Sequence, residues 1–269
     1  MGAGKCVRGV AKSVRGVAYG SGMHTAVFVF FALAQATLAG FAIRLYRQRR
    51  STALLMLTLP IAAVVWDNTI MAIGAPLLNR GYEGLLIALS WPRFIGHALF
   101  TPSWIVAAIG LCAIAGNKWA ASRAGHVTAW ALWGFAVLAG VMRYVVFLQM
   151  SPVWEGGMFY YTNTGTFPGP PIGSITMLLV VLVGGVVVWR QTKVPWMLLG
   201  SLFMLVTQLV PRELVGFLVT NSGEVVMAAS LVATASVLLK QSVGSLAAIL
   251  PDGAALPAEV PILDGATAA

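Results

Sequence analysis

Long apolar runs separated by short polar stretches make up the sequence between residues 24 and 240. Each run approaches the roughly 20 residues that an α-helix needs to cross the hydrocarbon core of a membrane. We count seven runs, at 24–43, 52–76, 93–115, 127–149, 173–189, 195–211 and 224–240. The pattern therefore predicts an all-α fold, an integral membrane bundle of seven transmembrane helices.

Short connections between the runs predict one membrane domain, from residue 23 to residue 241. In residues 1–22 the segment VRGVA occurs twice, which favours a basic tail lying on lipid head groups. A signal peptide is the alternative, but the apolar run that follows is long for one and ends in four arginines. Residues 242–269 are rich in alanine and proline, so we expect a disordered C-terminal tail.

Composition supports the membrane assignment, because 59% of the residues are hydrophobic and 9% are charged, against about 25% charged in soluble proteins. Nine basic residues follow alternate spans, which predicts a plasma-membrane protein with a cytoplasmic C-terminus. The basic N-terminal tail favours the opposite orientation. Anionic lipid head groups explain these bases, so no nucleic-acid partner is expected. The nine are Arg44, Arg47, Arg49, Arg50, Lys118, Arg123, Arg190, Lys193 and Lys240.

Four polar residues interrupt the apolar sequence between residues 61 and 102, namely Asp67, Asn68, Arg93 and His97. A charge at the centre of a membrane helix costs about 2.5 to 3.5 kcal/mol on insertion scales, so such residues usually pair inside a bundle and mark a functional site. Arg93 and His97 are four residues apart and share one helix face. We expect a helix break at Trp91 and Pro92, and a kink at Pro102.

Arg143 and Tyr144 interrupt the fourth span in a similar way. At 1.5 Å per residue, Arg143 lies about 24 Å and Asp67 about 22 Å from the cytoplasmic end of their helices. A salt bridge between these two level side chains would explain both without any function. A shared binding site is the other interpretation.

The acidic residues of the membrane region all fall on the outer half of the predicted bundle: Asp67, Glu83, Glu155, Glu213 and Glu224. Glu155 belongs to the long connection 151–172, which we expect to be either a lid over a site or an aromatic belt at the membrane interface. The convergence of acids predicts a shared, water-poor chamber near the extracytoplasmic leaflet.

Several chemistries lack the residues that they require. A paired-aspartate motif for a magnesium diphosphate is absent, and the three histidines fall at different heights, so we expect no metal and no cofactor. Acid–base chemistry remains, because carboxyl groups in different surroundings can serve as acid and base. Aromatic faces such as those of Trp66 and Tyr144 can stabilise a cation.

The motif WDN at 66–68, with an acid near the seventh span at Glu224, resembles the small seven-helix membrane terpene cyclases of meroterpenoid and prenylated-indole biosynthesis. The segments DNT, RFIGHALFTP and PRELVGF also look similar to that family. The resemblance implies metal-independent protonation of an alkene or epoxide in a hydrophobic, prenylated small molecule. The candidate catalytic residues are Asp67, Glu224 and Glu213. The candidate substrate contacts are Asn68, Trp66, Arg93, His97, Arg143, Tyr144, Glu155 and Arg212.

Two other classes stay open. In a proton-coupled transporter or lipid-binding protein, Asp67, Arg93 and Arg143 would form a proton relay. In a purely structural or sensory bundle, the same ion pairs would only fix how the helices pack.

Overall fold

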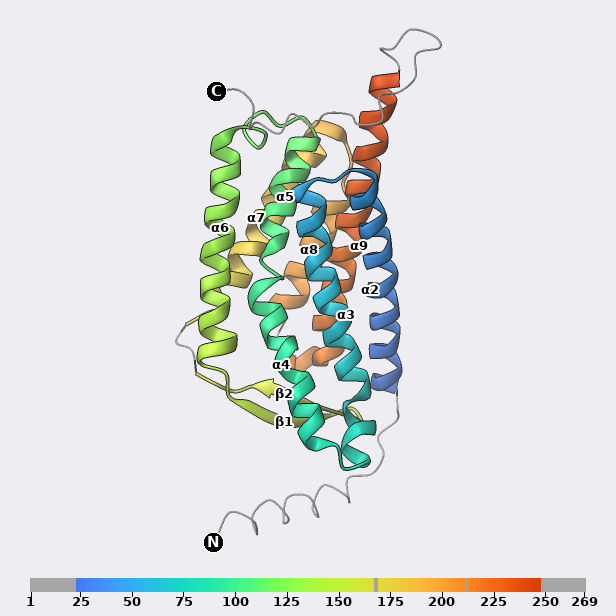
Figure 1. Cartoon of the computed structure of the whole chain (residues 1–269), viewed down its shortest axis with the longest axis vertical. Coiled ribbons are helices and arrows are strands. Elements are labelled where there is room, and N and C mark those ends of the chain that lie inside the picture. The colour runs from blue at the N-terminus through green and yellow to red at the C-terminus, as the bar shows by residue number, and fades with distance from the viewer. Residues whose placement is uncertain (1–22, 167–168, 211, 248–269) are drawn as a thin grey trace.

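The computed structural model describes residues 23–166, 169–210 and 212–247, and it describes the backbone alone for 212–215 and 243–247. The predicted tail at residues 1–22 lies outside the described residues, as does most of the C-terminal tail. Helices run side by side along one axis, and a β-hairpin crosses one end of the bundle (Figure 1). The elements are α2 (Met23–Gln48), α3 (Thr52–Asn79), α4 (Glu83–Leu99), α5 (Ser103–Ile114), α6 (Arg123–Val141), η1 (Met142–Val146), β1 (Met150–Glu155), β2 (Met158–Asn163), α7 (Ile172–Thr192), α8 (Trp196–Leu209) and α9 (Arg212–Ala247).

Five of the described helical segments are long and apolar enough to cross a membrane, and the bent pair α4 and α5 raises the number to six if it is one span. This composition is typical of a multi-pass membrane protein. The expected count of seven is not confirmed, because α8 has only 14 residues. A helix of that length rises about 21 Å, which is less than the roughly 30 Å of a hydrocarbon core.

The helix break expected at Trp91 and Pro92 is absent, whereas the kink expected at Pro102 is present. Helix α4 continues through Pro92, and the chain bends by 41° only between α4 and α5, next to Pro102. A proline inside a membrane helix is tolerated when neighbours bind the freed backbone carbonyls. The carbonyl that Pro92 frees is that of Ala88, four residues earlier. Trp66 Nε1 donates a hydrogen bond to the neighbouring carbonyl oxygen of Leu89, at 3.1 Å, which joins α3 to α4 beside the proline.

The long connection after α6 contains an antiparallel hairpin that the sequence analysis did not predict. Glu155 in β1 pairs with Met158 in β2, and the two residues between them are Gly156 and Gly157. Their φ angles of 56° and 84° suit a type I′ turn, which requires positive φ at both central residues. A two-residue turn therefore joins β1 to β2.

Strand β2 packs directly on the bundle. Its Met158 and Tyr160 join a buried cluster with Phe28 of α2 and Met71 of α3. At Gly74 of α3 the hairpin approaches so closely that an added Cβ would overlap the backbone carbonyl of Phe159. The hairpin is therefore part of the core at this end of the molecule.

Helix α9 is interrupted near its start, where Gly216 has a φ of 71° and a ψ of 172°. These angles are outside the helical region, so the regular helix resumes at Phe217. Its apolar span covers Gly216–Ser242, and the helix continues to Ala247. The helix therefore includes residues 242–247, the start of the tail that the sequence predicts to be disordered.

Candidate functional site

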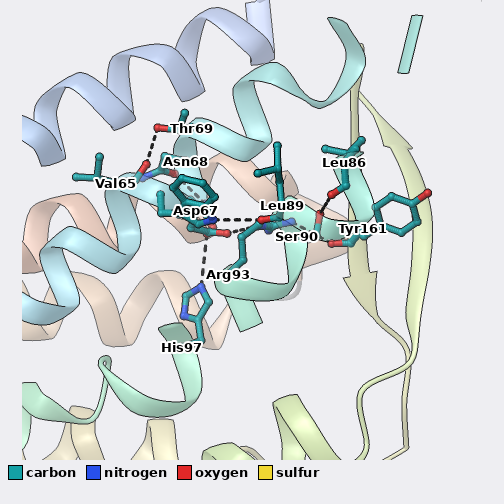
Figure 2. A network of polar contacts seen from close by, with 12 residues as sticks. Val65, Asp67, Asn68, Thr69, Leu86, Leu89, Ser90, Arg93, His97 and Tyr161 are labelled. Carbon is teal, nitrogen blue, oxygen red and sulfur yellow. Dashed lines mark hydrogen bonds and ion pairs between the residues drawn. The ribbon is translucent and has the colours of Figure 1, made fainter. Parts of the chain in front are cut away.

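A buried ion cluster joins α3 to α4. Arg93 Nε donates a hydrogen bond to Asp67 Oδ1, and His97 Nε2 lies 3.5 Å from Asp67 Oδ2. Figure 2 shows both side chains of α4 directed at the same carboxylate. Asp67 and Arg93 are only 3% and 6% exposed. The prediction that Arg93 and His97 share one helix face is confirmed by this geometry.

The hairpin contacts the cluster from the side. Arg93 Nη1 donates to the backbone carbonyl oxygen of Tyr161 at 3.1 Å, while the Tyr161 hydroxyl donates to Glu83 Oε1 at 3.1 Å. Burial, together with the hydrogen bond to Glu83, raises the pKa of Tyr161 to about 12. Strand β2 therefore fixes the orientation of the guanidinium that holds Asp67.

Glu224 of α9 brings a second carboxyl group to the cluster. It interacts electrostatically with His97, Asp67 and Arg93. Its Oε2 is buried and has no hydrogen-bond partner among the described residues. One turn earlier on α9, Asn221 Nδ2 donates to Asn68 Oδ1 at 3.5 Å, which links α9 to the residue beside Asp67.

A narrow cleft adjoins the cluster on the side of α6. The His97 and Tyr144 rings lie 6.2 Å apart, and Thr101 Oγ1 is 3.4 Å from His97 Nδ1. The cleft has a volume of about 20 Å³, and a buried water needs about 10 to 15 Å³. Its polar lining consists of His97, Thr101, Arg143, Tyr144 and Ser174.

Arg143 does not pair with Asp67, contrary to one interpretation of the sequence. Its Nη1 donates to the carbonyl oxygen of Gly169 at 3.4 Å, and Asp67 pairs with Arg93 and His97 instead. The two residues are level along their helices, but equal depth does not determine which faces of two helices meet.

Four other candidates lie apart from the cluster or beyond the described side chains. Trp66 is 38% exposed and lines an apolar groove of about 260 Å³ between α3 and α4. Glu155 lies in the hairpin, where it accepts hydrogen bonds from the Tyr160 hydroxyl at 2.7 Å and the Phe217 backbone N–H at 3.1 Å. The side chains of Arg212 and Glu213 are outside the described part of the chain.

Two contributors were not predicted from the sequence. Asn221 lies three residues before Glu224, so helical spacing alone places both on one face. The Tyr161 carbonyl offers no comparable signal, because it depends on the hairpin. Within the described residues, no group of three or more His, Cys, Asp or Glu side chains has the arrangement of a metal site.

No protein-family model matches this sequence, and a search of curated proteins finds no match either. The fold and the site together define the class: a helical bundle with membrane-length apolar helices around a buried cluster of two carboxyl groups, an arginine and a histidine.

Proposed function

We propose that this protein is a membrane-embedded acid–base catalyst that protonates an alkene or epoxide of a prenylated substrate and guides its cyclisation without metal. The main support is the buried Glu224 oxygen that has no hydrogen-bond partner in the described part of the chain, beside a carboxylate that Arg93 and His97 already hold. Two carboxyl groups in such different surroundings suit the roles of acid and base. The resemblance of the WDN motif to membrane terpene cyclases supports the same assignment.

Each carboxyl group has a distinct role in this proposal. An ionised carboxyl group without a partner is costly in an apolar setting, so Glu224 acts as the neutral acid. Its proton bonds to an alkene carbon or to the epoxide oxygen, and a neighbouring double bond closes the ring on the cation. Asp67, kept as an anion by Arg93, stabilises positive charge and accepts the final C–H proton. The product is therefore an isomer of the substrate.

The aromatic and histidine side chains complete the mechanism. The ring of Tyr144 lies 6.2 Å from that of His97 and offers a face to a cation near the cleft. His97 contacts Asp67 and interacts with Glu224, so it carries the proton from the base back to the acid. Asn68 supports the site indirectly through its hydrogen bond to Asn221.

The test is turnover by membranes that contain the protein. Given a prenylated indole or an epoxidised prenyl phenol in the presence of a chelator, they are expected to form cyclic isomers. Glu224→Gln should abolish product, whereas Glu83→Gln, an acid whose contact is the Tyr161 hydroxyl, serves as the matched control and should retain it. Equal turnover by wild type and Glu224→Gln at equal expression would remove Glu224 from the reaction.

A proton-coupled transporter or lipid-binding protein is the second candidate, and the narrow cleft favours it. A volume of about 20 Å³ is far below the roughly 300 to 1,000 Å³ of most small-molecule pockets. In proteoliposomes with an enclosed pH dye, a transporter would acidify the lumen when a solute gradient is applied, and a cyclase would not. If the protein is a transporter, membranes that contain it would also give no cyclic product in the turnover test.

We also infer seven membrane passes, a plasma-membrane location and a cytoplasmic C-terminus. The nine basic residues named above lie near the C-terminal ends of α2, α5, α7 and α9 or at the start of α6, and these ends lie opposite the hairpin (Figure 1). Positive residues are enriched in cytoplasmic loops. In a Cys6→Ser background, Lys118→Cys is expected to react with an impermeant thiol reagent only after cell lysis, and Arg80→Cys in intact cells. The reverse pattern would invert the orientation.

A further inference from the structure

Arg143 carries a charge that no acid balances. No carboxylate in the part of the chain that the structure describes lies within salt-bridge distance of it. Its hydrogen bond to the Gly169 carbonyl oxygen is 3.4 Å long, and it also interacts with the Tyr144 phenol. Charged residues within membrane spans almost always pair with one another or with backbone carbonyls. Among the described residues, Arg143, near the end of the apolar span Arg123–Val146, has the Gly169 carbonyl oxygen and no acid. This guanidinium therefore suits an anion that another molecule supplies.

Hydrogen-bond donors surround the same cleft. The hydroxyl-bearing residues Thr101 and Ser174 line it together with Arg143. Helix α7 begins there at Ile172 without a side-chain cap and without an acid in its first turn. Free backbone N–H groups at a helix start attract negative charge, which adds to the charge of Arg143.

The local backbone places these donors together. Residues 142–146 form the π-helix η1 at the end of α6, and such turns within helices are frequent at functional sites. Opposite, an added Cβ on Gly173 would lie 2.8 Å from the carbonyl oxygen of Ala136, so the start of α7 packs directly on α6. The cleft is thus built by a non-standard turn and a close helix contact.

We propose that this cleft, which must widen from its volume of about 20 Å³, binds the anionic head group, a carboxylate or a phosphate, of a single-chain amphiphilic substrate. Arg143 neutralises the head, and Thr101 and Ser174 donate hydrogen bonds. The apolar wall formed by Ala136, Ala139 and Met177 carries the chain toward His97 and Glu224. The identification of the ligand as substrate rests on the proposed function, and it narrows the substrate class to prenylated acids or phosphates.

The experiment measures binding and does not require turnover. The full chain in nanodiscs of phosphatidylcholine is titrated with farnesyl phosphate, with farnesol and with inorganic phosphate, and empty nanodiscs correct for partition into lipid. We expect farnesyl phosphate to bind at least about tenfold more tightly than farnesol, because hydrogen bonds to charged groups are the strong ones. This comparison uses the wild type, so it stands even if a variant fails to fold.

Variants then localise the site. Arg143→Gln is expected to reduce farnesyl phosphate binding about tenfold or more, and Arg143→Lys less. Arg80→Gln is the matched control, since Arg80 is an exposed arginine at the same end of the bundle, and it should leave binding unchanged. Glu224→Gln should also keep binding, so a failure of the proposed chemistry and a failure of this site are distinguishable.

Three results would overturn the inference. The first is equal affinity for farnesol and farnesyl phosphate. The second is an equal loss in Arg80→Gln and Arg143→Gln, which would indicate a general surface charge effect. The third is a complete loss of farnesyl phosphate binding in nanodiscs of phosphatidylglycerol, because the anionic lipid would then occupy the cleft with its own head group.

Discussion

Asp67 and Arg93 form an ion pair across the contact between α3 and α4, with side chains only 5% and 7% exposed. Such a pair is valuable mainly because its loss leaves an uncompensated charge. Breaking a buried pair by removing one partner typically costs about 3 to 5 kcal/mol.

Single replacements in this pair are therefore expected to be more damaging than the pair's own strength suggests. Asp67→Asn and Arg93→Gln should each lower the free energy of unfolding by about 3 kcal/mol. The double variant should lose clearly less stability than the sum of the two single losses, because neither charge of the pair remains. Steric trapping or thermal unfolding in nanodiscs measures the stability of the wild type, the two single variants and the double variant, with Glu83→Gln as control. Strictly additive losses would contradict a coupled pair.

Gly74 is expected to be intolerant of the smallest side chain. A Cβ there would overlap the Phe159 carbonyl, and overpacking of this kind costs about 1 to 3 kcal/mol. Gly40→Ala is the matched control, since nothing lies within 4 Å of the added Cβ on α2 and a helix gains up to about 1 kcal/mol from this change. Opposite signs in thermal unfolding are predicted, and a neutral Gly74→Ala would mean that the hairpin does not pack on α3.

Glu155 is expected to hold the start of the regular part of α9. Its carboxylate accepts from the Phe217 N–H and from the Tyr160 hydroxyl, and the Phe217 and Tyr160 rings stack at 5.4 Å. Glu155→Ala should speed hydrogen exchange at the Phe217 amide and lower stability by about 1 to 2 kcal/mol. Glu155→Gln keeps an acceptor oxygen and should stay near wild type. Similar exchange in both variants would remove this role.

Stability at alkaline pH should depend on Tyr161. Its pKa is raised from 10.0 to about 12 by burial and by the hydrogen bond to Glu83, so the folded state holds the proton more tightly than the unfolded state. The resulting stabilisation is fully present below pH 10 and is lost as the pH rises toward 12. The stability difference between wild type and Tyr161→Phe should therefore be constant below pH 10 and shrink above it. A constant difference across this range would contradict the assignment.

Helical periodicity and hydropathy predicted the parts of the site that lie on one helix. A spacing of four residues predicts that Arg93 and His97 share one helix face. Pro102 in turn predicts the kink between α4 and α5. Partners on different helices were harder to infer, because α3 is apolar around most of its circumference. No periodic signal in the sequence tells which face of α3 points into the bundle. The sequence therefore places Trp66 in the site and leaves a salt bridge between Arg143 and Asp67 as one of two interpretations.

The hairpin was missed for a different reason. The segment EGGMFYYT has two glycines followed by β-forming aromatic residues, which is a recognisable hairpin signal. The neighbouring prolines and glycines obscured it, and the segment was interpreted as a loop. The Tyr161 carbonyl contact to Arg93 could not be inferred without that element.

Because ribosomal synthesis proceeds from the N-terminus, the break at Gly216 has a bearing on biogenesis. When α3, α4 and the hairpin have emerged, Asp67 already has both of its partners, Arg93 and His97, whereas Glu224 arrives with the last helix. Docking of Phe217 onto the hairpin is thus the event that delivers the second carboxyl group. A nascent chain that stops before this point would carry the ion pair without its acid.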